Sequence, residues 1–248
     1  MPCLVCGSAE TVRSHILPRA LMHDIRAGEK HAVAGWRDRD GTMFTQSGIW
    51  DGEILCAAHE GALHDADTYA VEFCRTFDEV AEPTPQANGF MVPNPQPELL
   101  PRFAMAVVWR YCVSRFGQAR GQKLGPWEHT LRSLIFEVHA TATAPDLMVM
   151  RQLAQIDRRT IPFATQPHSA RHNGITYWQF QVAGLLFRMK LDRRPDGMPP
   201  MLLAAGRDPL IVCDLGAQDV RHVKGYQPVF ERMAVSRTSE NGEVSDPA

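Results

Sequence analysis

The stretches that decide the fold are two short motifs, Cys3-Leu4-Val5-Cys6 at the start of the chain and Cys56-Ala57-Ala58-His59 further along. Each motif places two metal-binding side chains three positions apart, a spacing that lets both side chains point at one ion. A Zn²⁺ ion accepts three thiolates and one imidazole in a closed tetrahedral site. We therefore expect Cys3, Cys6, Cys56 and His59 to hold a structural Zn²⁺ ion. The ion would supply folding energy to a segment that has little hydrophobic core of its own.

The same residues have a simpler interpretation. Cys3 and Cys6 can lie incidentally at a frayed terminus, while Cys56 is a buried helical cysteine and His59 a surface residue one turn later. The other three cysteines have no partner at metal-binding spacing and are expected to be buried small hydrophobic residues: Cys74, Cys112 and Cys213.

Composition narrows the class of protein. The chain has 248 residues, with 26 Lys and Arg against 28 Asp and Glu, so contact with nucleic acid must come from a local basic patch. The sequence has no apolar run long enough for a membrane span, and it opens with Met1-Pro2-Cys3 rather than a signal peptide. We expect a cytoplasmic protein that does not bind membranes.

The chain divides into four segments by composition. Turn-forming residues dominate before residue 53, and a helix is expected from Glu53 to Phe77. Prolines crowd residues 82 to 101. We expect a zinc-binding domain (1–81), a Pro-rich linker (82–101), a helical plus β-hairpin domain of unknown role (102–232) and a disordered tail (233–248).

The segment after the prolines predicts helices followed by strands. Apolar spacing indicates helices at Leu100–Arg115, Trp127–Thr141 and, less regularly, Asp146–Ile156. Within the first of these, Trp109 is expected in the core and Arg110 at the surface. Alternation around an Ala183-Gly184 turn predicts a β-hairpin over residues 176–191, and further strands are expected at 201–205 and 210–213. The fold class is therefore α+β, with a C-terminal antiparallel β region.

Two elements near the metal motifs carry a resemblance to a known family. They are Ser14-His15-Ile16-Leu17-Pro18 and Asp51-Gly52-Glu53-Ile54-Leu55-Cys56. With the zinc motifs they resemble the zinc-containing HNH (ββα-metal, treble-clef) endonucleases of bacteria and phages. The resemblance covers about residues 1 to 75, and it implies a ββα-metal domain at the N-terminus.

The resemblance implies a metal-dependent endonuclease that hydrolyses DNA phosphodiester bonds. His15 falls on the general base of the family, which takes a proton from water, while Mg²⁺ or Mn²⁺ stabilises the departing oxygen. Asp51 has the offset that the family gives an Asn. Glu60 takes the place of the final His, and His64, one helical turn later, could supply the missing imidazole. The implied catalytic set is His15, Asp51, Glu60 and His64.

The residues also allow other interpretations. Ser14 stands where the family has a metal ligand, His15 can simply hydrogen-bond a carbonyl, and Glu60 and His64 can belong to a solvated helix face. The alternative function is a non-catalytic, zinc-stabilised protein that binds a protein or a nucleic acid, for example in phage and host conflict. An enzyme with its active site in the C-terminal region is a third option. The sequence leaves the oligomeric state open.

Overall fold

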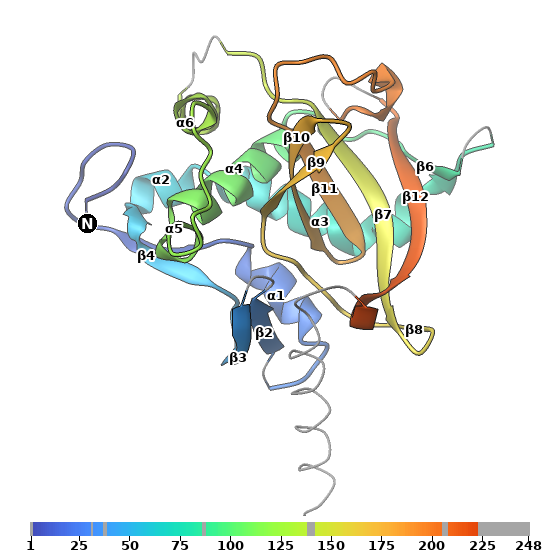
Figure 1. Ribbon diagram of the computed structural model, residues 1–248, viewed down its shortest axis with the longest axis horizontal. Helices are drawn as coiled ribbons and strands as arrows, with labels where there is room; N and C mark the ends of the chain where they lie inside the picture. Colours follow the sequence, from blue (N-terminus) through green and yellow to red (C-terminus); the bar gives the residue numbers. More distant parts are fainter. Residues whose placement is uncertain are drawn as a thin grey trace, which may run out of the picture.

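The computed structural model shows a mixed α+β protein (Figure 1). It describes residues 2–30, 32–36, 39–85, 88–137, 142–204 and 208–222, without the side chains of 33–44 and 201. The predicted tail at 233–248 lies outside the described residues. Among the helices that are described, none is long and apolar enough to cross a membrane.

The N-terminal part is richer in regular structure than the turn-forming residues predicted. Its elements are β1 (Val12–His15), α1 (Arg19–Ile25), β2 (Ala32–Trp36), β3 (Arg39–Thr45), β4 (Trp50–Leu55), α2 (Ala57–Gly61) and α3 (His64–Val80). Strand β1 pairs antiparallel with β4, and β2 with β3. The helix expected from Glu53 begins only after β4, because Ile54 and Leu55 continue the strand as buried residues.

Three helices follow in the middle of the chain: α4 (Leu99–Val113), α5 (Arg115–Gln118) and α6 (Trp127–Phe136). Helices are confirmed at both predicted places, although α6 ends at Phe136, and the predicted continuation over 138–141 lies outside the described residues. Helix α4 is buried on all sides from Leu100 to Val113 apart from Arg102, and it contacts α3, α5, α6 and β11. Arg110 is therefore not a surface residue, as the sequence suggested, but is fully buried in the last turn of α4.

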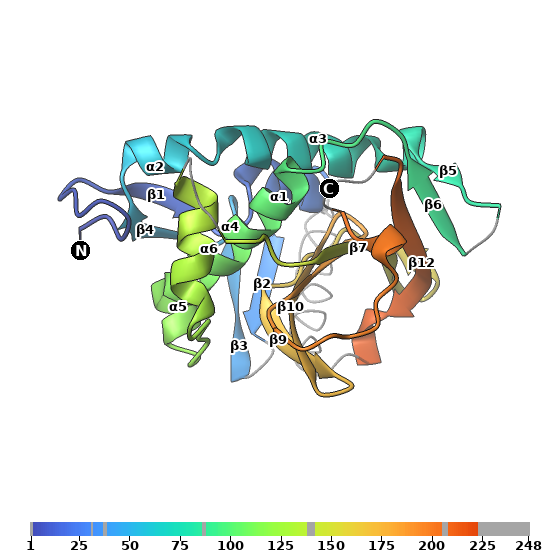
Figure 2. The ribbon, with the colours of Figure 1, turned by 90° about the horizontal axis from the view of Figure 1, so that it is seen from above.

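A curved eight-stranded sheet lies on the side of the molecule away from the N-terminus (Figures 1 and 2). Its order is β5 (Glu82–Pro83), β6 (Gly89–Val92), β12 (Leu210–Asp219), β7 (Leu147–Ile156), β11 (Leu185–Lys190), β10 (Ile175–Val182) and β9 (His168–His172), and β8 (Arg159–Thr160) pairs with β7. All neighbours are antiparallel except β12 and β7. Two short 3-10 helices lie at Pro200–Leu202 and Val220–His222.

The sheet confirms some predictions and overturns others. The hairpin of β10 and β11 is confirmed, as is a strand from Leu210. The helix expected at Asp146–Ile156 is wrong, because this segment is the central strand β7. The strand expected at 201–205 is also wrong where it is described, since a 3-10 helix occupies residues 200–202. The proline-rich stretch contributes β5 and β6 to the sheet.

One hydrophobic core joins both parts of the chain, from Cys3 and Leu55 to Val212. The inner face of the sheet packs on α4, where Phe103 meets Phe180 and Phe187 at ring distances of 5.8 and 5.5 Å. The opposite face carries a smaller apolar cluster, which includes Tyr177 of β10, a residue 3% exposed. Figure 2 shows α3 extending from the end that carries the N-terminus and α2 towards the far edge of the sheet.

Candidate metal centre and adjoining pocket

Four side chains meet at the N-terminal end of the molecule. The ligand atoms of Cys3, Cys6, Cys56 and His59 all lie within 4.8 Å of one another, as the spacing of the two motifs predicted. The Sγ atoms of Cys6 and Cys56 are 3.8 Å apart, and Nδ1 of His59 lies 3.2 Å from Sγ of Cys56 and 3.7 Å from Sγ of Cys3. Sulfur ligands at about 2.3 Å from a tetrahedral zinc ion are separated by roughly 3.8 Å.

Local backbone structure explains why the two motifs converge. The amide of Gly7 donates to the carbonyl of Cys3 at 2.8 Å, and the amide of Cys3 donates to the carbonyl of Ser8 at 2.7 Å, which closes a tight loop around Cys6. Gly7 has φ +76°, a conformation that glycine adopts without strain. Cys56 is the N-cap of α2, so His59 lies within the first turn of that helix. The pairing of β1 with β4 brings these two segments together.

The donor set fits a structural zinc ion. Burial raises the pKa of the Cys3 thiol, but hydrogen bonds from the backbone of Cys6, Cys56 and Val5 outweigh this effect and lower the pKa to about 7. A thiol that loses its proton near neutral pH is a ready ligand for zinc. Three thiolates and one imidazole complete the tetrahedron and leave no open position for chemistry. The cluster could therefore hold zinc as a structural ion.

His15 lies at the end of β1, opposite Trp50 of β4. The side chain is half-buried, and within the described part of the chain its buried Nε2 atom has no hydrogen-bond partner. Burial lowers the pKa of His15, and the positive charges of Arg110, Arg19 and Arg13 lower it further. The imidazole is therefore neutral at physiological pH, and its Nε2 atom has no partner within the described residues.

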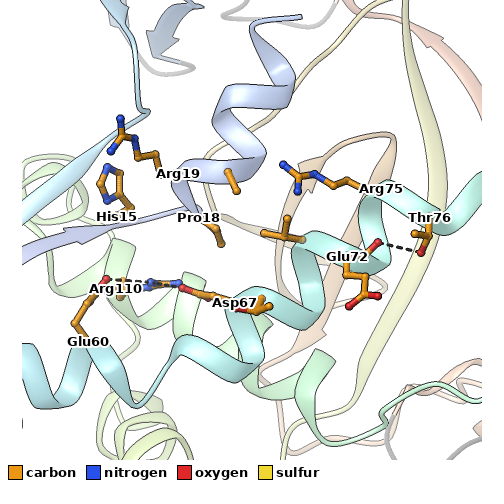
Figure 3. Close-up of a pocket in the computed structure, with 12 residues that line it drawn as sticks. His15, Pro18, Arg19, Glu60, Asp67, Glu72, Arg75, Thr76 and Arg110 are labelled. Carbon is orange, nitrogen blue, oxygen red and sulfur yellow. Dashed lines mark hydrogen bonds and ion pairs between the residues drawn. The ribbon is translucent and has the colours of Figure 1, made fainter.

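His15 opens into a pocket of about 600 Å³ between α1, α2, α3 and α4 (Figure 3). Glu60 of α2, Asp67 of α3 and Arg110 of α4 form its inner wall, and Arg19 lies beside His15 at the start of α1. Four elements of the N-terminal part, β1, α1, α2 and α3, and one helix of the C-terminal part, α4, thus build a single cavity.

The two carboxylates of the inner wall, Asp67 and Glu60, are already engaged. Asp67 accepts two hydrogen bonds from Arg110, each 3.0 Å long. Glu60 accepts a hydrogen bond of 2.6 Å from the hydroxyl of Ser14, and its other oxygen lies 3.9 Å from Nη1 of Arg110. Burial raises the pKa of Glu60, which the charge of Arg110 and the bond from Ser14 oppose.

Two sequence candidates have other surroundings. Asp51 is 2% exposed, and its oxygens accept hydrogen bonds from the amides of Glu53 at 3.0 Å and Arg115 at 2.8 Å. Asp51 therefore fastens the start of β4 to α5. His64 is exposed at the first residue of α3 and is not among the described residues that line the pocket. Of the four candidates, the structure brings His15 and Glu60 together.

The donors do not fit a dedicated site for the divalent cation that the resemblance implies. Both oxygens of Asp67 are used by Arg110, and Glu60 is shared between Ser14 and the same guanidinium. Among the residues that the structure describes, the zinc cluster is the one group of three or more donors placed to hold a metal ion. The inner wall of the pocket therefore offers a divalent cation no free set of carboxylates.

Sequence reasoning missed the pairing of Arg110 with Asp67. Arg110 was predicted to lie at the surface next to Trp109, and Asp67 was not among the predicted site residues. The available signal was a single charge within the otherwise apolar run from Phe103 to Val113. A fully buried arginine needs a carboxylate partner, but the sequence does not say which one.

Trp50, which pairs with His15 across the strands, has two arginines close to its ring. The guanidinium carbon of Arg13 is 4.6 Å from the ring centre of Trp50, and that of Arg115 is 5.9 Å from it. In the described ranges, Arg13, Arg19 and Arg115 form no ion pair with a carboxylate. Cationic and aromatic groups of this kind are suited to phosphates and bases of nucleic acid.

Comparison with known protein families, curated proteins and solved structures finds no match for this chain. The resemblance to HNH endonucleases therefore stays a prediction from the sequence motifs.

Proposed function

We propose that this protein is an HNH-type endonuclease that hydrolyses DNA phosphodiester bonds, with His15 as general base. The observation that carries the proposal is the free, buried Nε2 of a neutral His15 at a pocket bordered by arginines. The order of β1, β4 and α2 around the cysteine and histidine cluster also agrees with a ββα-metal, treble-clef-like unit. In this proposal the cluster holds a structural Zn²⁺ ion.

The chemistry needs a base and positive charge. Neutral His15 takes a proton from a water molecule while the water oxygen bonds to phosphorus. The bond from phosphorus to the leaving oxygen then breaks, and that oxygen takes a proton from the solvent. Arg19 and Arg13 are exposed beside His15 and attract the phosphate, whose negative charge increases as the water attacks.

The test is cleavage of supercoiled plasmid by the zinc-loaded protein, in buffers with Mg²⁺, with Mn²⁺ and with neither. The His15→Ala variant is expected to lose at least about a hundredfold in rate, because a general base contributes about 10²- to 10⁴-fold. His172→Ala removes an exposed histidine of β9 and serves as the control. Absence of cleavage by the wild type in every buffer, or equal rates for the two variants, would contradict the proposal.

A second candidate is a zinc-stabilised protein that binds nucleic acid without cutting it. The observation in its favour is that Arg110 donates two hydrogen bonds to Asp67, because they occupy a carboxylate that a nuclease could use to bind a metal ion. In this case Trp50, flanked by Arg13 and Arg115, would stack on an unpaired base. A protein partner, and a role in phage and host conflict, stay predictions of the sequence.

Binding of a fluorescent single-stranded oligonucleotide tests this second candidate. Trp50→Leu is expected to weaken binding by about 5- to 100-fold, because stacking on an aromatic ring contributes about 1–3 kcal/mol per base. Trp127→Leu alters another partly buried tryptophan, on α6, and should leave binding unchanged. If both variants bind as the wild type does, Trp50 is not part of a nucleic-acid surface.

A further inference from the structure

Arg110 places a charge in α4, a helix whose residues from Phe103 to Val113 are all buried. It lies in α4 beside Trp109, and its side chain is 0% exposed. Transfer of a guanidinium from water into such surroundings is unfavourable unless carboxylates compensate for the lost hydration. Its placement therefore depends on the groups that α2 and α3 offer on the pocket side.

Those groups are Glu60 and Asp67, two of the three carboxylates that line the His15 pocket; the third is Glu72 of α3. Arg110 donates two bonds to Asp67 in the planar, paired geometry that favours arginine over lysine, and it faces Glu60 at 3.9 Å (Figure 3). The hydroxyl of Ser14, which is itself 0% exposed, holds the second oxygen of Glu60. The guanidinium thus occupies the position between two acids where a divalent cation would otherwise bind.

A divalent cation and Arg110 compete for the same acids. A divalent ion at Glu60 would have two protein ligands, one free carboxylate oxygen and the imidazole of His15. The positive charge of the nearby Arg110 would repel it. If Arg110 lost its bonds to Asp67, its guanidinium would be buried beside α4 without a carboxylate partner. Repulsion of the cation and loss of the Arg110 ion pair therefore both disfavour replacement of Arg110 by a divalent cation.

We propose that the guanidinium of Arg110 is the built-in cation of the His15 pocket, so that the pocket works without a bound divalent ion. Arg110 acts as a positioning residue: it neutralises Asp67, orients Glu60 and adds positive charge beside His15. Its use in catalysis rests on the proposed nuclease function, whereas its role in excluding metal does not. The C-terminal part of the chain would then complete the site of the N-terminal part.

Binding of Mn²⁺ to the zinc-loaded full chain tests the proposal without any activity measurement. Electron paramagnetic resonance reports free Mn²⁺, and the wild type is expected to leave that signal undiminished at sub-millimolar Mn²⁺. Arg110→Met frees Asp67 and Glu60, and should bind Mn²⁺ at least about tenfold more tightly than the wild type. Arg110→Lys keeps the charge and should behave as the wild type does.

Glu60→Gln supplies the decisive control. If the wild type binds one Mn²⁺ ion at micromolar concentration and Glu60→Gln abolishes this binding, the proposal is overturned. This comparison does not need Arg110→Met to fold. In the plasmid assay, buffers freed of divalent ions by a chelating resin should support the same rate as buffers with Mg²⁺, to within about twofold. Absence of cleavage in all buffers would count against the nuclease function alone, and the Mn²⁺ measurement would still decide the role of Arg110.

Discussion

At the scale of single residues, the protonation of His15 depends on several neighbours. Burial, Arg110, Arg19 and Arg13 lower its pKa, and Asp67 opposes them. As the pH falls below about 6.5, histidine in the unfolded chain gains a proton before His15 does in the folded chain. Stability is therefore lost as the pH falls through this window, and the neutral base persists below the usual pKa of histidine.

Replacement of Arg19 tests this account. Arg19→Gln removes a positive charge near the imidazole, so the pKa of His15 is expected to rise towards the ordinary value of histidine. Titration of the histidine ring protons by NMR measures the shift. Arg171→Gln alters an exposed arginine of β9 and is the matched control. Equal pKa values for His15 in the two variants would show that Arg19 does not act on this site.

At the scale of elements, the sequence predicts structure best where one face is buried. The hairpin of β10 and β11 was predicted because Trp178, Phe180 and Val182 alternate with polar residues. Strand β7 was mistaken for a helix because Leu147 to Met150 are all buried, which produces a continuous apolar run without alternation. Tyr177 is buried because residues such as Met198 and Leu203 pack against the outer face of the sheet. The periodicity of a strand does not reveal whether other residues cover its second face.

One part of the candidate site could be predicted from the sequence and another could not. The cluster of Cys3, Cys6, Cys56 and His59 could be predicted because each half is a local motif and the ligand chemistry is specific. The inner wall of the pocket could not, because Arg110 and Asp67 are far apart in the sequence and come together only when α4 packs on α3. Helix contacts of this kind depend on tertiary structure that no local pattern encodes.

At the scale of the whole molecule, the metal centre is tied to the C-terminal part through α6. Arg132 donates to the carbonyl of Leu4 at 3.3 Å, and the ring of Phe136 packs edge-on against His59 at 5.4 Å. Phe136 also contacts Trp109, the neighbour of Arg110. Loss of the metal should therefore loosen α6 and the pocket wall as well as the loop at Cys6.

Removal of zinc tests this coupling. We expect one zinc ion per chain, lost in the Cys3→Ser/Cys56→Ser double variant and retained in Cys213→Ser, whose partly exposed cysteine lies outside the cluster. Zinc release should lower the melting temperature by at least about 10 °C, because the closed site contributes folding energy.

Hydrogen exchange should become faster in residues 3–8, 57–61 and 127–136, while the hairpin of β10 and β11 stays protected, because the contacts of α6 with the metal loop are lost. A chain that is purified without zinc would show that the four side chains are not a zinc site. Faster exchange confined to residues 3–8 would show instead that the metal orders its own loop alone and leaves α6 and the His15 pocket unaffected.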